Sequence, residues 1–204
     1  MKIRVISFLL ITAVILSVLS GCSSSPKTII INYFEYKTDL TKLDLFNTKL
    51  TNSDIEPLKY MKNLTMLDLG ENQISDVSAL KDLKKLTELN LGSNQVSDVS
   101  VLKDLKKLTA LYLYTNQISD ISALKGLTNL EILYLGANQI SDITPLKGLT
   151  NLEILNLNSN QISDITPLKG LINLRKLSLG DNNISEEQIK ELQSALPNCY
   201  INID

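Results

Sequence analysis

The chain has 204 residues, of which 44% are hydrophobic, and it contains neither histidine nor tryptophan. Its formal net charge of −2 at pH 7 argues against a nucleic-acid partner, because binding a polyanion needs a clustered basic face. The sequence has no Gly-rich phosphate loop, no cysteine cluster and no serine beside a base, so we predict no enzyme, no metal and no cofactor. Catalysis by isolated carboxylates stays open, although no pair of them stands out.

Residues 1–21 have the pattern of an export signal, with two basic residues ahead of an apolar run, Val5 to Leu19, that is too short to span a bilayer comfortably. The stretch Leu19-Ser20-Gly21-Cys22 that follows resembles the lipobox of bacterial lipoproteins. That resemblance implies cleavage before Cys22, a diacylglycerol on its thiol and often a second acylation such as palmitate on its new amine. Two or more acyl chains would anchor the protein stably on the outer side of the cell membrane. In a cell with two membranes, the outer membrane or periplasm is possible; an ordinary signal peptide with a chance cysteine is the alternative.

Three further segments follow the leader. Residues 22–27 comprise the predicted lipidated cysteine and a short polar tether, Ser23 to Lys27. Residues 28–39 are expected to form an N-terminal capping strand, because Ile29 to Tyr36 is rich in β-branched and aromatic residues. Residues 40–204 then form one repeat domain.

In the repeat domain the same sequence pattern recurs every 22 residues, starting at Leu64. Leucines in near-alternation, as in Leu86, Leu89 and Leu91, predict a short strand in each copy, and apolar residues at intervals of three then predict 3₁₀ turns rather than long helices. Each copy also carries an asparagine that is expected to bond backbone groups where the chain leaves the strand, in a stacked column: Asn72, Asn94, Asn116, Asn138, Asn160 and Asn182.

The pattern LxxLxLxxNxIxD with this period resembles the leucine-rich repeats of the short bacterial type found in internalins. The resemblance implies an α/β fold, a leucine-rich-repeat solenoid with a curved parallel β-sheet on its concave face and 3₁₀ or extended turns on its convex face. The immunoglobulin-like domain, the long helical cap and the wall-anchoring tail associated with internalins are missing from the sequence. Their role in invasion is therefore not carried over.

The last copy changes character after Ile184. The stretch SEEQIKELQSALPN has apolar residues at helical intervals and Ser185 as an N-cap, which predicts a C-terminal α-helix. Cys199 and Ile201 lie 22 residues after Leu177 and Leu179, so a closing strand should follow with Cys199 buried at a leucine position.

The residues between the strand leucines should project from the concave face, where the copy LYLYTNQISD differs from its neighbours in carrying two tyrosines. Exposed aromatic and aliphatic side chains in a row are typical of a contact site, so we predict a surface-exposed protein-binding module. Its ligand-binding residues would be Tyr112, Tyr114, Tyr134, Ile132, Ile154, Asn90 and Asn156. The protein partner would belong to a host or to the same cell envelope. Alternatives are a glycan ligand, a structural role in an envelope complex, or tyrosines that only pair across strands to stabilise the sheet.

Two charged columns are expected to be solvated or to cap turns rather than to bind ligands. One holds Lys81, Lys103, Lys125, Lys147 and Lys169, and the other holds Asp76, Asp98, Asp120, Asp142 and Asp164. One carboxylate per turn supplies too few ligands for calcium, which is bound by about six to eight oxygens.

Overall fold

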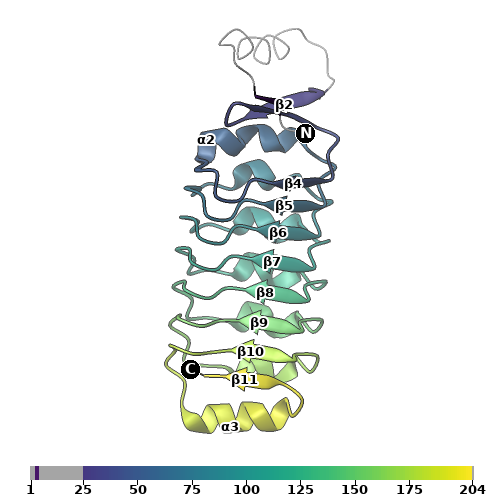
Figure 1. The fold of residues 1–204 in the computed structure, drawn as a ribbon. Coiled ribbons are helices and arrows are strands. Elements are labelled where there is room, and N and C mark those ends of the chain that lie inside the picture. The colour runs from purple at the N-terminus through teal and green to yellow at the C-terminus, as the bar shows by residue number, and fades with distance from the viewer. Residues whose placement is uncertain (1–2, 5–24, 204) are drawn as a thin grey trace.

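The computed structural model describes residues 3–4 and 25–203. Eight strands of the repeat domain form one parallel sheet in chain order (Figure 1). Equivalent leucines pair in register from strand to strand, as in Leu89↔Leu111 and Leu111↔Leu133. The strands are β4 (Lys42–Asp44), β5 (Met66–Asp68), β6 (Glu88–Asn90), β7 (Ala110–Tyr112), β8 (Ile132–Tyr134), β9 (Ile154–Asn156), β10 (Lys176–Ser178) and β11 (Tyr200–Asn202).

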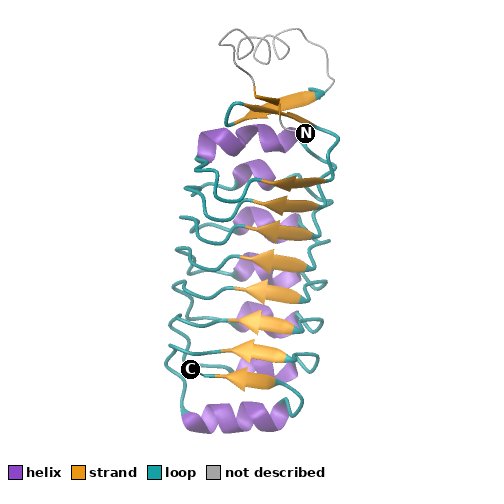
Figure 2. Ribbon diagram, viewed as in Figure 1, coloured by secondary structure: helices purple, strands orange, loops and turns teal. Residues whose placement is uncertain are grey.

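The opposite side of the stack is built from 3₁₀ helices, as the period of three predicted (Figure 2). A short α-helix, α2 (Asn52–Ile55), leads into the first of them. The 3₁₀ helices are η1 (Glu56–Tyr60), η2 (Ser78–Leu80), η3 (Ser100–Asp104), η4 (Ser122–Gly126), η5 (Thr144–Gly148) and η6 (Thr166–Gly170). The expected leucine-rich-repeat solenoid of the α/β class is therefore confirmed.

One continuous core runs between the sheet and these turns. Leu89, Leu111 and Leu133 on the strands and Leu102 and Leu124 on the 3₁₀ helices have no exposed surface. Each such side chain stabilises the fold by about 1.5–3 kcal/mol through burial. Because a single copy cannot cover its own apolar edge, stability depends on the stacking of neighbours.

The asparagine column behaves as the sequence predicted. The Asn138 side chain donates to the carbonyls of Leu113 and Leu135, each at 3.0 Å, and accepts a hydrogen bond of 3.0 Å from the backbone N–H of Ile118 in the preceding copy. The same acceptor bond recurs from Asn72 to Asn182. Among the described residues, no buried side-chain nitrogen or oxygen lacks a partner.

The N-terminal cap differs from the expected single strand. β2 (Thr28–Ile31) and β3 (Phe34–Lys37) form an antiparallel hairpin, and the two residues of its turn, Asn32 and Tyr33, have φ angles of 47° and 67°. Positive φ at both central positions gives the turn type whose twist suits a two-residue hairpin. A third short strand, β1 (Ile3–Arg4), lies on the other edge of β3.

The C-terminal cap confirms the helix and corrects the register of the strand after it. α3 (Glu186–Ala195) begins after Ser185, whose side chain accepts a hydrogen bond from the Gln188 N–H in a capping box. β11 pairs Ile201 with Leu177, not with Leu179. Cys199 is buried in the core as expected, but it precedes the strand and does not take the place of Leu177.

A physical reason for this shift lies in the geometry of the helix. An α-helix rises about 1.5 Å per residue and a 3₁₀ helix about 2.0 Å, so an α-helical copy needs more residues to cross the same width. The first copy, which contains α2, shows the same offset, because Leu43 pairs with Leu67 instead of with the residue 22 positions on. Two copies with α-helical turns are thus longer than those with 3₁₀ turns alone.

Candidate binding face on the parallel sheet

The concave face, which we define as the solvent side of β4 to β11, carries three parallel columns of residues. The strand pairing fixes their order along the stack. The first column contains Glu88, Ala110, Ile132, Ile154 and Lys176. The second contains Asp68, Asn90, Tyr112, Tyr134, Asn156 and Ser178. The third follows the strand ends and contains Phe46, Gly70, Gly92, Tyr114, Gly136 and Asn158.

This pairing brings the predicted site residues together on β6 to β9, with Tyr114 two residues after the end of β7. At the end of the sheet, Tyr200 pairs with Lys176 and therefore lies in the first column, because the last copy is longer.

Tyr112 and Tyr134 are direct cross-strand partners on β7 and β8. Their ring centroids lie 5.4 Å apart with the planes tilted by 33°, a geometry that favours attraction between aromatic rings. Partial burial raises the pKa of Tyr112, and the nearby charge of Glu88 and the Tyr134 hydroxyl add to this rise. The Tyr112 phenol is therefore neutral at physiological pH and can donate a hydrogen bond to a ligand.

Tyr114 stands beside this pair because a glycine, Gly92, follows the end of the neighbouring strand β6. A Cβ atom built on Gly92 would come 2.3 Å from the ring carbon Cζ of Tyr114. The ring therefore lies directly over Gly92, and only a residue without a side chain allows that position. Phe46 uses Gly70 in the same way, with its Cδ2 atom 3.0 Å from the Cβ that Gly70 lacks.

The expectation that these aromatic and aliphatic side chains are exposed holds only in part. Tyr112, Tyr114 and Tyr134 are all half-buried, as are Ile132 and Ile154. The rings cover one another and the sheet beneath, so part of their area stabilises the fold and the remainder faces solvent. Cross-strand pairing and a contact role are thus compatible.

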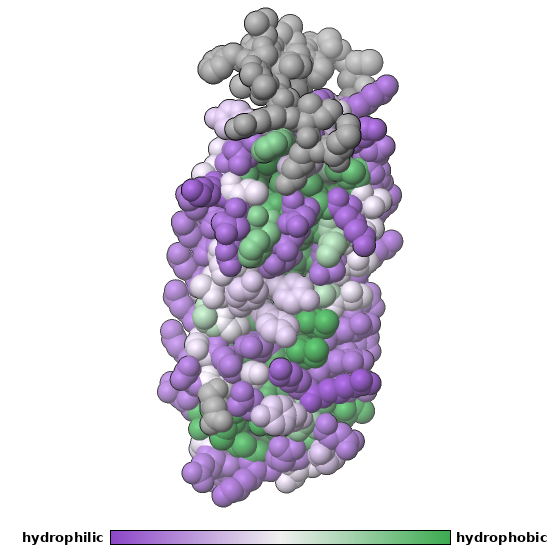
Figure 3. Space-filling model, viewed as in Figure 1, coloured by the Kyte–Doolittle hydropathy of each residue, from purple (hydrophilic) through white to green (hydrophobic). Residues whose placement is uncertain are grey.

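The aliphatic residues extend the aromatic centre along the first column. Ile132 pairs with Ala110 on one side and with Ile154 on the other. Figure 3 shows this face with a pale centre over β7 and β8 and a green, apolar patch next to it. Glu88 borders the patch on β6 and Lys176 borders it on β10, so opposite charges lie at its two ends.

The two asparagines of the predicted site make contacts within the sheet. Asn90 donates to the Asp68 carboxylate at 2.9 Å and accepts from the backbone N–H of Gly92 at 2.9 Å. Asn156 accepts from the Asn158 N–H at 3.1 Å. These bonds fix the amides in place as a polar border of the apolar centre. Glu88 was not among the predicted site residues. The sequence did contain the signal for it, because Glu88 lies two residues before Asn90 just as Ile132 and Ile154 lie two residues before Tyr134 and Asn156.

The aspartate column caps the 3₁₀ turns, as predicted. The Asp98 and Asp142 carboxylates each accept the backbone N–H two residues later, at 2.7 Å from Ser100 and 2.8 Å from Thr144. The pKa of the Asp98 carboxyl is lowered mainly by the backbone bond from Ser100 and then by its hydroxyl, and the pKa of the Asp142 carboxyl is lowered mainly by the Thr144 hydroxyl and then by its backbone N–H. Within residues 25–203, no cluster of cysteine and acidic side chains is arranged to hold a metal ion.

The fold and the face can now be compared with known proteins. A family model described as leucine-rich repeats in two copies matches residues 38–82, 62–104, 84–126, 106–148 and 128–170, and a leucine-rich-repeat model matches residues 173–195. The chain belongs to the leucine-rich-repeat family. A comparison with curated proteins finds no match.

Solved structures place this leucine-rich-repeat protein among bacterial relatives. An internalin C2 from Listeria monocytogenes is 34% identical, with a TM-score of 0.62 over 84% of this chain and 86% of that one. A second Listeria monocytogenes internalin, inlF, is 28% identical, with a TM-score of 0.66 over 95% of this chain and 61% of that one. A leucine-rich-repeat protein of Leptospira interrogans is 28% identical, with a TM-score of 0.59 over 72% of this chain and 45% of that one. The fold is therefore internalin-like.

Proposed function

We propose that this protein is a lipid-anchored, surface-exposed recognition module that binds another protein through the centre of its concave face, and that it has no catalytic role. The observation that carries the proposal is the cluster of Tyr112, Tyr114, Tyr134, Ile132 and Ile154 on adjacent strands. Half-buried tyrosines are held in place before binding, so they lose little conformational entropy when a partner covers them. Similarity to internalins supports a binding role of the repeats.

The anchor is proposed from the sequence alone, because Cys22 lies outside the described residues. Its support is the apolar leader that ends in Leu-Ser-Gly-Cys. Among the described residues, no helix is both long and apolar enough to cross a membrane. Metabolic labelling with an alkyne fatty acid tests the anchor: label on the wild type and none on Cys22→Ser supports it, and an unlabelled wild type contradicts it.

Affinity capture tests the binding face. The full chain and a variant with Tyr112, Tyr114 and Tyr134 changed to alanine are each exposed to host surface extract and to envelope extract of the producing cell. We expect the wild type to retain a protein that the triple variant releases. The control is Ile172→Ala, which removes a side chain that is 74% exposed and lies outside the concave columns.

Two results of this experiment would redirect the proposal, and one folding control accompanies it. A partner retained equally by all three proteins would move the contact to another surface and favour a structural role in an envelope complex. Release by soluble oligosaccharide would instead identify a glycan ligand, since aromatic rings also stack on sugars. Circular dichroism of the triple variant must show a folded protein, because the tyrosine pair also stabilises the sheet by about 0.2–1 kcal/mol.

A further inference from the structure

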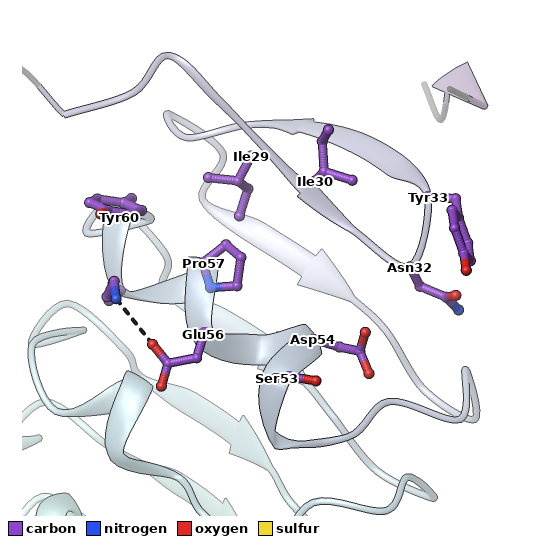
Figure 4. Close-up of a pocket in the computed structure, with 10 residues that line it drawn as sticks. Ile29, Ile30, Asn32, Tyr33, Ser53, Asp54, Glu56, Pro57 and Tyr60 are labelled. Carbon is purple, nitrogen blue, oxygen red and sulfur yellow. Dashed lines mark hydrogen bonds and ion pairs between the residues drawn. The ribbon is translucent and has the colours of Figure 1, made fainter. Parts of the chain in front are cut away.

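A cleft of about 640 Å³ lies at the N-terminal end of the solenoid, away from the centre of the concave face (Figure 4). One wall is the hairpin, which contributes Ile29 and Ile30 of β2. The facing wall is formed by α2 and η1, where Pro57 and Tyr60 are the lining residues with apolar rings. A cleft of this size and lining is typical of a ligand site.

The cleft follows the outer edge of β2. Ile29 and Ile30 are consecutive residues of a strand and therefore point to opposite faces, yet both line the cleft. The three-stranded sheet has the order β1-β3-β2, so within the described part of the chain no strand pairs with the other side of β2. The space between an edge strand and a neighbouring helix can accept an extended peptide.

The pairing pattern shows which backbone groups face this space. Ile31 and Phe34 flank the two-residue turn and so exchange both hydrogen bonds, and such pairs alternate along an antiparallel hairpin. The next pair, Ile30 and Glu35, is then the kind that makes no bonds to each other. The N–H and C=O of Ile30 consequently point away from β3, at the edge of β2 where Ile30 lines the cleft.

The sequence of β2 makes this edge receptive to pairing. Natural edge strands usually carry a charge, a proline or a bulge that prevents another strand from adding. β2 reads Thr-Ile-Ile-Ile and has none of these.

Charge indicates one feature of the occupant. Glu56 is bound to Lys59 at 3.0 Å, and the Lys59 ammonium lies 5.6 Å from the centre of the Tyr60 ring. Asp54 carries the second negative charge of the cleft, and its carboxylate is held in place by hydrogen bonds of 2.8 and 2.7 Å from the N–H and the hydroxyl of Thr51. The end of the cleft at Asp54 therefore favours a positively charged side chain.

We propose that this cleft binds an extended peptide segment of a partner protein, which adds to β2 as a further strand. The segment places aliphatic side chains against Pro57 and Tyr60 at alternate positions and a lysine or arginine next to Asp54. This site is distinct from the tyrosine cluster and does not depend on the concave face as a binding surface.

The test uses fluorescein-labelled peptides of about six residues, long enough to cover β2, with alternating valine and serine and a terminal lysine. Binding to the full chain is followed by fluorescence anisotropy. Ile30→Pro removes the outward N–H without removing a bond to β3, and we expect it to weaken binding about tenfold. Glu35→Pro is the comparison variant, since it places a proline directly across the hairpin from Ile30, on the edge of β3 that pairs with β1 and lies away from the cleft.

The peptide backbone provides a second readout. N-methylation at alternate peptide residues should abolish binding, whereas N-methylation at the residues between them should not, because only alternate N–H groups of an added strand face β2. Replacing the terminal lysine by glutamate should also weaken binding. The triple tyrosine variant must bind the peptides like the wild type, which separates this site from the concave face. Failure of every peptide to bind the wild type, or equal losses with Ile30→Pro and Glu35→Pro, would overturn the proposal.

Discussion

Replacing Asn138 by alanine tests the asparagine column, because every bond that its side chain makes is known. Its side-chain nitrogen donates to the carbonyls of Leu113, Leu135 and Gly136. Each carbonyl keeps another donor in the variant: the Asn116 amide at 3.1 Å, the Asn160 amide at 3.1 Å and the Thr115 N–H at 2.8 Å, respectively. The three carbonyls therefore contribute little to the loss.

The loss comes from the single bond that nothing replaces. The Ile118 N–H donates to the Asn138 side-chain oxygen, and Ile118 has no exposed surface. A buried donor without a partner costs about 1–3 kcal/mol, so Asn138→Ala should lower the free energy of unfolding by that amount. Asn138→Asp should be worse than alanine at neutral pH, because its carboxylate would lie against three carbonyl oxygens.

Chemical denaturation followed by circular dichroism measures both variants. Asn129→Ala is the control, since the Asn129 side chain makes a 2.7 Å bond to the carbonyl of Lys106 but is exposed. We expect it to change stability by less than about 0.5 kcal/mol. A loss for Asn138→Ala no larger than that of the control, or an aspartate variant more stable than the alanine variant, would refute the reasoning.

Three further predictions concern backbone strain, the capping carboxylates and the Tyr112 phenol. Thr115 is exposed and has a φ angle of 52°, which strains a β-branched residue, so Thr115→Gly should raise the free energy of unfolding by about 1 kcal/mol in urea denaturation; a loss would contradict this. The pKa values of Asp98 and Asp142 are lowered in the folded protein, so the unfolded chain takes up protons first as the pH falls. Stability should therefore fall as the pH drops from the ordinary value of 3.8 through the lowered values. Changing both residues to asparagine should flatten that part of a stability-against-pH curve, and an unchanged curve would count against the capping bonds. Glu88→Gln should lower the pKa of Tyr112 in an ultraviolet titration without returning it to the ordinary value, because burial is the larger cause of the rise.

The elements that the sequence predicted correctly are those set by local repetition. Leu111 and Leu133 stay in phase because each strand must stack on the one before it. The start of α3 was predictable for a local reason too, because the Ser185 side chain just before the helix caps its first turn. The register of Ile201 could not be read from the 22-residue period, since it depends on how far α3 advances per residue. The hairpin turn at Asn32 and Tyr33 was missed because it contains no glycine to mark it.

The candidate site was predictable in position but not in packing. The strand period placed Tyr112 and Tyr134 in one column, and the pairing confirms it. The sequence could not show that their rings touch, that Tyr114 lies over Gly92, or that all three are half-buried, because these features depend on side-chain conformation across strands. The role of these residues in binding stays a prediction.

The central claim is that a partner protein covers the tyrosine cluster, and hydroxyl-radical footprinting of the captured complex tests it most directly. Mass spectrometry reports the oxidation of each tyrosine with and without the partner. We predict protection of Tyr112, Tyr114 and Tyr134 and unchanged oxidation of Tyr200, which is 66% exposed at the far end of the sheet. Unchanged oxidation of the three central tyrosines in a stable complex would contradict the account.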